Sequence, residues 1–305
     1  MHDRPLVLFV PGLKPKPEPA AHRELLRRCL EAGLARVEPD VARQFAAAAA
    51  DFDLVAWTYD FYGEHRDVAL DAPCVEALLA KGDADARDRA EAASWRRRVL
   101  RSLHRLGDRV PFLIPHLADE NVALHLRDLR RYVKNVNDVA EVTRRHLKVP
   151  LRAAAAAGRP VLLLAHSMGS VIAWDALWQL SRDPHYDGRV SLLMTLGSPL
   201  GQRYIQKRLL GRNEAGRARY PQVIDRWVNV AAVGELTALD GRLSGDFAPM
   251  LQYGLLDSLE DVQTWNWYRD HGALNVHAEY GYLANADTAR YVADWWRVQH
   301  APAGD

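Results

Sequence analysis

The stretch that decides the fold runs from Pro160 to Leu180 and reads PVLLLAHSMGSVIAWDALWQL. Its apolar, β-prone run over residues 161–164 predicts a buried strand. The apolar residues that recur three and four positions apart after Gly169 predict a helix. A strand that leads through a short turn into a helix is the repeating unit of an α/β protein with a parallel sheet.

The turn around Ser167 has small residues where the strand and the helix would approach most closely. Gly169 stands two residues after the serine and Ala165 two residues before it. Small side chains there allow a sharp turn that projects the serine hydroxyl above the sheet, next to the amino terminus of the helix. The alternative is a buried serine that caps an ordinary helix, since serine is a favoured N-cap residue.

The composition is that of a globular protein with no strongly charged partner. The 305 residues are 49% hydrophobic and 26% charged, and 40 basic against 39 acidic side chains give a net charge of +1. This balance provides no overall field for nucleic acid or an anionic membrane. Two cysteines cannot form a disulfide framework, and CxxC, HExxH and Walker-type motifs are absent. We therefore expect no metal, no cofactor and no nucleic-acid partner.

Signals for secretion or membrane insertion are absent from the sequence. The apolar run at residues 6–10 ends at Pro11 and is too short for the core of a signal peptide. A span needs about 18 uninterrupted apolar residues, which no segment provides. The expected location is the cytoplasm.

Six segments are predicted strands of a mostly parallel sheet flanked by helices. Residues 6–10 form a continuous apolar run between prolines, which is typical of a strand buried on both faces. Residues 264–268 alternate aromatic and polar side chains, as a partly exposed edge strand would. The predicted strands are residues 6–10, 52–59, 161–164, 190–196, 227–233 and 264–268.

Residues 64–150 contain no convincing strand and read as helical segments rich in Ala, Arg and Asp. A short crossover would suffice here, so the interval predicts a helical insertion or cap within a single domain over residues 1–305. Within it, the basic amphipathic segment 95–106 precedes a short apolar loop at 110–115. One interpretation is a lid that contacts a lipid surface weakly or covers an apolar pocket. The other is a core-packed helix with a solvated arginine face.

The residues AHSMG, with a strand before them and a helix after them, resemble the nucleophile elbow of the α/β-hydrolase superfamily, in particular its lipase- and esterase-like members. The Gly-Ser-Pro turn after the fourth predicted strand is also similar to these enzymes. The resemblance implies an α/β-hydrolase fold in which Ser167 is the nucleophile. Pro199 disfavours an elbow at Ser198, so both residues are assigned to the substrate pocket, together with Gly12 and His166.

In this superfamily, the loop after the first of these strands supplies one N–H group of the oxyanion hole. That loop is Pro11-Gly12-Leu13 here, with Pro in the place where His is common. The resemblance assigns the two donors to the N–H of Leu13 and the N–H of Met168, the residue after the nucleophile. The alternative is that Pro-Gly only ends the strand in a turn.

A serine hydroxyl needs a neighbouring base, and the base needs an anion that orients it. The superfamily orders these groups along the chain as nucleophile, acid and histidine. The histidine is therefore expected in a loop before the last helix. His277 meets this condition better than His271 and His300, so it is the predicted base and His271 is the alternative.

The predicted acid is Glu235, the first carboxylate after the fifth predicted strand. The superfamily usually has Asp at the equivalent place, but a longer Glu can reach the histidine if its loop lies slightly farther back. Asp240 is the main rival and Asp246 is a weaker one.

Together, these residues imply hydrolysis of a small-molecule carboxylic ester, with an apolar acyl group, through an acyl-enzyme. A thioesterase or an acyltransferase would use the same triad. A non-catalytic protein of the same fold, which binds a partner or an apolar ligand, is the alternative from a different class. Ala165, Pro11 and Glu235 depart from the superfamily's pattern and leave room for that alternative.

Overall fold

A parallel six-stranded sheet forms the centre of the molecule, as the computed structural model describes it over residues 4–94, 120–235 and 242–301. The strand order is β2-β1-β3-β4-β5-β6, and each neighbouring pair runs parallel. This confirms the predicted α/β class. The strands are β1 (Leu6–Val10), β2 (Phe52–Leu54), β3 (Val161–His166), β4 (Val190–Leu196), β5 (Ile224–Ala232) and β6 (Ser258–Thr264).

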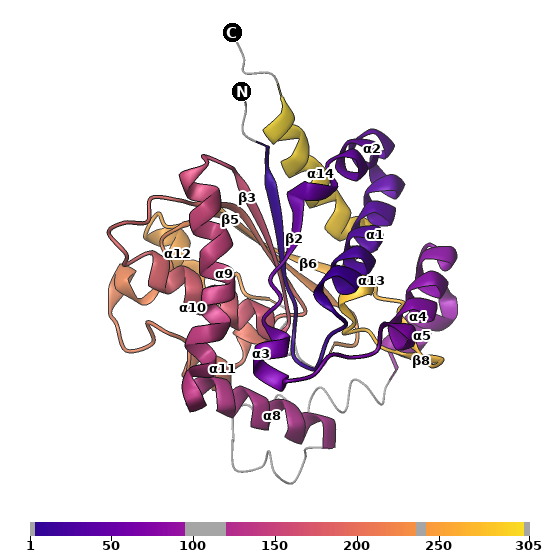
Figure 1. Ribbon diagram of the computed structural model, residues 1–305, viewed down its shortest axis with the longest axis horizontal. Coiled ribbons are helices and arrows are strands. Elements are labelled where there is room, and N and C mark those ends of the chain that lie inside the picture. The colour runs from indigo at the N-terminus through magenta and orange to yellow at the C-terminus, as the bar shows by residue number, and fades with distance from the viewer. Residues whose placement is uncertain (1–3, 95–119, 236–241, 302–305) are drawn as a thin grey trace.

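Helices cover both faces of the sheet, in three layers (Figure 1). In β1, Leu8 and Val10 belong to the hydrophobic core beneath α9 (Val139–Ala156) and α10 (Met168–Leu180). The alternate residues, Val7 and Phe9, belong to a second core beneath α1, α2 and α14. Side chains alternate across a strand, so an unbroken apolar run supplies both cores. The helices that cover this second core are α1 (Pro19–Val37), α2 (Pro39–Ala47) and α14 (Ala286–His300).

Shorter elements occupy the connections between these layers. A two-stranded antiparallel hairpin, β7 with β8, lies outside the main sheet. The remaining helices are α3 (Thr58–Tyr62), α4 (Val68–Lys81), α5 (Ala86–Ala92), α8 (Glu120–Val133), α11 (Arg203–Gln206), α12 (Ala248–Gln252) and α13 (Glu279–Leu283). The hairpin strands are β7 (Arg269–Asp270) and β8 (Ala273–Leu274), and the 3-10 turns are η1 (Ala49–Asp51), η3 (Val136–Asp138), η4 (Pro199–Gly201) and η5 (Gly216–Arg219).

The order of the strands reverses at the carboxyl ends of β1 and β3. From β1 the chain passes to β2 on one side, and from β2 it crosses back to β3 on the other side of β1. Open α/β sheets bind their ligands at such a topological switch point. Gly12 follows β1 and Ser167 follows β3, so both residues lie at this switch point.

The described parts of residues 64–150 are helical and contain no strand, as predicted. Their helices do not form one layer, because α4 packs on α1 whereas α9 packs on α10. The segments 95–106 and 110–115, on which the lid interpretation depends, lie outside the described residues.

Two predicted strands differ from the structure. The strand predicted at residues 52–59 ends at Leu54, and Thr58–Tyr62 forms helix α3 instead. The buried Trp57 precedes this helix, and its indole N–H donates to the carbonyl of Pro11 at 3.0 Å. A short apolar run is compatible with a strand or a buried helical turn, and here tertiary packing selects the turn.

The sixth strand was predicted too late in the sequence. Strand β6 is Ser258–Thr264, which pairs with β5 along its whole length. Trp267 and Tyr268, the aromatic residues behind the prediction, lie beyond the strand and are buried. The polar sequence of β6 carries no apolar alternation, because an edge strand is held mainly by its backbone ladder.

Among the described residues, no helix combines the length and the apolar character needed to cross a membrane. Both cysteines are free thiols, Cys29 on α1 and Cys74 on α4.

Candidate active site

Ser167 lies in a strained turn between β3 and α10. Its backbone angles are φ 52° and ψ −123°, in a region that residues other than glycine rarely occupy. Its N–H donates to the carbonyl of Leu196 on β4 at 2.9 Å, which ties the turn to the sheet. The serine side chain does not cap α10. The turn therefore presents the hydroxyl at the carboxyl edge of the sheet.

Two glycines allow the backbones around Ser167 to approach closely. A Cβ atom at Gly169 would lie 2.3 Å from the carbonyl oxygen of Val10, at the end of β1. A Cβ atom at Gly12 would lie 2.9 Å from the Cβ of Ser167. Ala165, in contrast, is fully buried in the core, which has room for its methyl group. Distance therefore requires glycine at position 169, whereas position 165 accepts the methyl group of alanine.

Ser167, His277 and Glu235 form a chain of hydrogen bonds. The Oγ of Ser167 lies 2.9 Å from Nε2 of His277, and Nδ1 of His277 lies 2.8 Å from Oε2 of Glu235. An ionised carboxylate accepts only, so Nδ1 carries the proton and Nε2 accepts from the serine hydroxyl. The three side chains come from the end of β3, the loop after β5 and the loop before α13. The structure therefore brings together the three residues predicted as nucleophile, base and acid.

Glu235 is buried and held by neighbouring groups. The hydroxyl of Tyr282 on α13 donates to its Oε2 at 3.2 Å and accepts from the N–H of Ala232 at 3.0 Å. Gly234 adopts φ 83°, and a Cβ atom there would lie 2.3 Å from the carbonyl oxygen of Ala92. Donors offset the cost of burying a carboxylate, so the site can keep this anion away from water.

The backbone of His277 is fixed on both sides, while its ring stays accessible. Its N–H donates to Oδ1 of Asn275 at 3.1 Å, and its carbonyl accepts from Nε2 of His166 at 2.7 Å. Next along the chain, the carbonyl of Ala278 accepts from the buried Asn266 at 2.8 Å. The side chain of His277 is 27% exposed, so a substrate could reach it.

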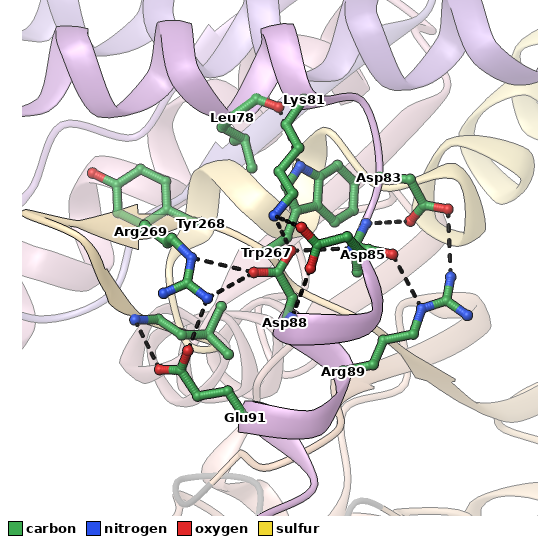
Figure 2. A network of polar contacts seen from close by, with 12 residues as sticks. Leu78, Lys81, Asp83, Asp85, Asp88, Arg89, Glu91, Trp267, Tyr268 and Arg269 are labelled. Atoms are coloured by element: carbon green, nitrogen blue, oxygen red, sulfur yellow. Dashed lines mark hydrogen bonds and ion pairs between the residues drawn. The ribbon is translucent and has the colours of Figure 1, made fainter.

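A charged network anchors the hairpin that precedes His277 (Figure 2). The Arg269 guanidinium on β7 donates to Oδ1 of Asp88 and to Oε2 of Glu91, both on α5, at 2.8 Å each. Lys81 also binds Asp88 and, at 2.8 Å, Asp85. Burial would raise the pKa of Asp88, but Lys81 and Arg269 outweigh it and lower that pKa.

Helix α5 therefore supports the loops of both His277 and Glu235. Its Asp88 and Glu91 hold the hairpin that leads to His277, as Figure 2 shows. The carbonyl of Ala92, its last residue, packs against Gly234 beside the acid. No sequence pattern indicated this role, because it depends on contacts between segments far apart in the chain.

The residues considered as alternatives for the base and the acid have other surroundings or lie outside the described residues. His271 is exposed in the turn of the β7–β8 hairpin, with Asp270 at 3.6 Å as its ion-pair partner. His300 stacks on Trp296 at the end of α14. The rival acid Asp240 lies outside the described residues. Asp246 accepts a hydrogen bond from Gln206 at 3.0 Å.

The two predicted oxyanion donors flank the serine. Met168 is the first residue of α10, and the first N–H groups of a helix have no acceptor within it. Leu13 follows Gly12, whose backbone lies against Ser167. Its N–H has no hydrogen-bond partner in the part of the chain that the structure describes. The next N–H, of Lys14, donates to the hydroxyl of Tyr62 at 2.9 Å and so holds this loop.

The side chains assigned to the substrate pocket are largely turned inward. Ser198 is buried, accepts from the N–H of Leu200 at 3.2 Å and bonds the hydroxyl of Ser170 at 2.7 Å. Pro199 is buried at the start of η4. The ring of His166 is buried behind His277. Gly12 lies directly against Ser167, since a Cβ atom there would be 2.9 Å from the serine Cβ.

Sequence reasoning gave no role to three residues that shape the site. Tyr282 binds the acid, Asn266 holds the chain next to the base, and Glu279 lies behind His166. For Glu279 and Tyr282, the signal in the sequence is their position in EYGYL, within five residues after His277.

Comparisons of the chain with protein-family models, with curated proteins and with solved structures each found no match. Within residues 4–94, 120–235 and 242–301, no group of three or more His, Cys, Asp or Glu side chains could hold a metal ion. Any assignment of function therefore rests on the residues of the site themselves.

Proposed function

We propose that the protein is a serine hydrolase of the α/β-hydrolase superfamily that cleaves a carboxylic ester. The observation that carries this proposal is the chain of hydrogen bonds from Ser167 through His277 to Glu235, at 2.9 and 2.8 Å. A serine that only capped α10 would accept from an N–H of the first helical turn, and Ser167 makes no such bond. Its hydroxyl bonds His277 instead, and its backbone has a strained conformation of the kind that clusters at active sites.

In the first half of the reaction, Oγ of Ser167 attacks the ester carbonyl carbon and its proton passes to Nε2 of His277. Glu235 stabilises the imidazolium that forms. The N–H groups of Leu13 and Met168 would hold the oxyanion. The carbon–oxygen bond to the alcohol then breaks, the proton of His277 goes to the leaving alkoxide, and an acyl-enzyme remains.

In the second half, His277 takes a proton from water, and the resulting hydroxide attacks the acyl carbon. The bond to Ser167 breaks, and the proton returns from His277 to Oγ, which releases the carboxylic acid. The serine proton leaves with the alcohol and a proton from water replaces it, so Ser167 and His277 are regenerated and the cycle as written uses no cofactor.

The arrangement of elements supports the superfamily assignment. The proposed nucleophile follows β3, the acid follows β5 and the base precedes the last helix, which is the order the superfamily uses. Of the three departures from its pattern, Ala165 fits a core with room for a methyl group, and Glu235 reaches His277. Pro11 leaves the N–H of Leu13 in place.

The finer assignments remain part of this proposal. The substrate would be a small-molecule ester with an apolar acyl group, although a thioesterase or an acyltransferase would use the same residues. The single domain over residues 1–305, the cap within residues 64–150, weak contact with a membrane surface and a cytoplasmic location belong to the same proposal.

Hydrolysis of p-nitrophenyl esters of increasing acyl length tests the function. We expect wild type to turn over at least one ester, and His277→Gln to lose about a thousandfold or more in kcat/KM, since a base is removed. His271→Gln is the matched control and should keep wild-type activity, because that side chain is exposed and distant from the serine. Equal activity of wild type and His277→Gln would contradict the proposal. Parallel thioesters would separate a thioesterase from an esterase.

A further inference from the structure

A second carboxylate, Glu279, is buried behind the histidine of the site. Its Oε1 accepts from Nζ of Lys16 at 2.9 Å and from Nε2 of His22 at 2.7 Å. Its Oε2 faces Nδ1 of His166 at 3.4 Å. The side chain is 4% exposed, so Lys16 and His22 replace water around Oε1, whereas Oε2 has no hydrogen-bond partner among the described residues.

The partners of Glu279 come from separate parts of the site. Lys16 belongs to the loop after β1, which includes the proposed oxyanion donor, and His22 belongs to α1. His166 ends β3 directly before Ser167, and Glu279 itself begins α13, two residues after His277. One carboxylate therefore joins the loop after β1, the strand before the serine and the segment of the base.

His166 links this carboxylate to the base. Its Nε2 lies 2.7 Å from the carbonyl oxygen of His277, and a carbonyl only accepts, so Nε2 carries the proton. The Nδ1 atom then carries no proton, and it lies 3.4 Å from Oε2 of Glu279 without a hydrogen bond between them. The rings of His166 and His277 lie side by side with centroids 4.7 Å apart. A Cβ atom at Gly12 would come within 3.0 Å of the His166 ring, so glycine there leaves the ring its space.

The charges of this cluster follow from its surroundings. Burial would raise the pKa of Glu279, but Lys16 and His22 outweigh it and hold that pKa well below its ordinary value. Burial lowers the pKa of His166, against the opposing effect of Glu279. At neutral pH the cluster therefore combines the Glu279 anion with the Lys16 ammonium, next to an uncharged His166.

We propose that the Glu279 carboxylate, through its negative charge, and His166, through its hydrogen bond to the His277 carbonyl, position His277 and help to stabilise its positive charge when it holds the serine proton. This inference rests on the proposed function. Neither residue is placed to touch the reacting atoms, so both are positioning residues that act through His277.

Two substitutions separate this role from simple support of the fold. The groups that face His277 are Ser167, Glu235 and His166, and those that face Glu279 are Lys16, His22 and His166. Glu279→Gln keeps the shape but removes the negative charge, which leaves the Lys16 ammonium unbalanced and disfavours the imidazolium of His277. Lys16→Met removes the positive charge of the ammonium and therefore favours the imidazolium of His277. The two variants therefore act with opposite sign.

The experiment measures the rate of inactivation by a fluorophosphonate from mildly acidic to mildly alkaline pH. The rate rises as His277 becomes neutral. The pH at which the rate is half of its maximum, the midpoint, therefore reports the protonation of the base. We expect the midpoint to move down by about 0.5 pH unit or more in Glu279→Gln and to move up in Lys16→Met. Glu76→Gln is the control, because it removes an exposed carboxylate that pairs with Arg28 far from the site, and it should leave the midpoint in place.

The outcomes distinguish the inference from the function on which it rests. A folded wild type that never reacts would overturn the proposed function. A reactive wild type whose variants share its midpoint, or shift in one common direction, would overturn the inference alone.

If Glu279→Gln fails to fold, two variants of His166 decide the matter. His166→Gln can still donate to the His277 carbonyl and should keep a rate within about threefold of wild type, whereas His166→Leu cannot and should lose about tenfold. Equal rates for the two would overturn the inference.

Discussion

Two serines follow neighbouring strands of the sheet and face the same edge, yet the structure treats them differently. Ser167 follows β3 and Ser198 follows β4 after Gly197, and both side chains are buried. Ser167 has φ 52° and ψ −123°, whereas Ser198 has φ −77° and ψ 136°, an ordinary extended conformation. The difference begins in the next residues, because Met168 and Gly169 start a long helix and Pro199 starts a 3-10 turn.

The hydroxyl groups have correspondingly different partners. Ser170 donates to the carbonyl of Ser167 at 2.6 Å, so the proton between Ser170 and Ser198 comes from Ser198. Ser198 also accepts from the N–H of Leu200, which leaves its hydroxyl fully used in the turn. Ser167 has His277 as its partner instead. The backbone thus decides which of two similar serines meets a base.

The largest effect is expected where the elbow loses its close approach. Gly169→Ala would place a Cβ atom 2.3 Å from the carbonyl oxygen of Val10, so β1 and α10 must move apart. We expect a loss of about 2–4 kcal/mol in the free energy of unfolding, and about a hundredfold in ester hydrolysis because the serine moves. Urea unfolding and kcat/KM measure the two effects.

Gly245→Ala is the control for this prediction, since a Cβ atom there meets nothing within 4 Å. It should leave both quantities near wild type. If Gly169→Ala behaved like this control, the close approach of β1 to the elbow would not be what shapes Ser167.

An intermediate effect is expected at the acid. Tyr282→Phe removes the hydroxyl that donates to Glu235 and that accepts from the N–H of Ala232. We expect kcat/KM to fall about tenfold with little change in KM, since a hydrogen bond to a charged group is lost. Tyr291→Phe removes a more exposed hydroxyl, bound to Glu260, and should have no effect. Equal kinetics in both variants would show that Tyr282 does not support the acid.

The smallest effect is expected at the second serine. Ser198→Ala removes two hydrogen bonds of the η4 turn, which should cost about 1 kcal/mol of stability and less than about twofold in kcat/KM. A large loss of activity with unchanged stability would mean that Ser198 takes part in the chemistry. The contrast between the two serines would then be wrong.

The sequence predicts the fold best where an element is buried and locally patterned. The strands β1, β3 and β4 and the helix after Ser167 combine long apolar runs with clear turn residues. β6 was misplaced because its sequence, SLEDVQT, is polar and its pairing with β5 defines it. The end of β2 was missed because packing of Trp57 against Pro11 starts a helix there.

The residues of the candidate site also differ in how well the sequence predicts them. The AHSMG motif indicated Ser167, and the order of elements favoured His277 over His271 and Glu235 over Asp240; the structure brings Ser167, His277 and Glu235 together. The surroundings of Glu279 could not be predicted, because Lys16 is 263 residues away in the sequence and His22 is 257 away. Such contacts exist only once the sheet has placed its loops at one edge.

Labelling with a fluorophosphonate, followed by intact mass and peptide mapping, tests the central claim most directly. The account predicts one adduct on wild type, located at Ser167, no adduct on Ser167→Ala, and an adduct on Ser198→Ala. An adduct at Ser198, or none on folded wild type, would contradict the claim that the elbow presents an activated serine. The absence of any adduct would favour a protein of this fold that binds a ligand without cleaving it.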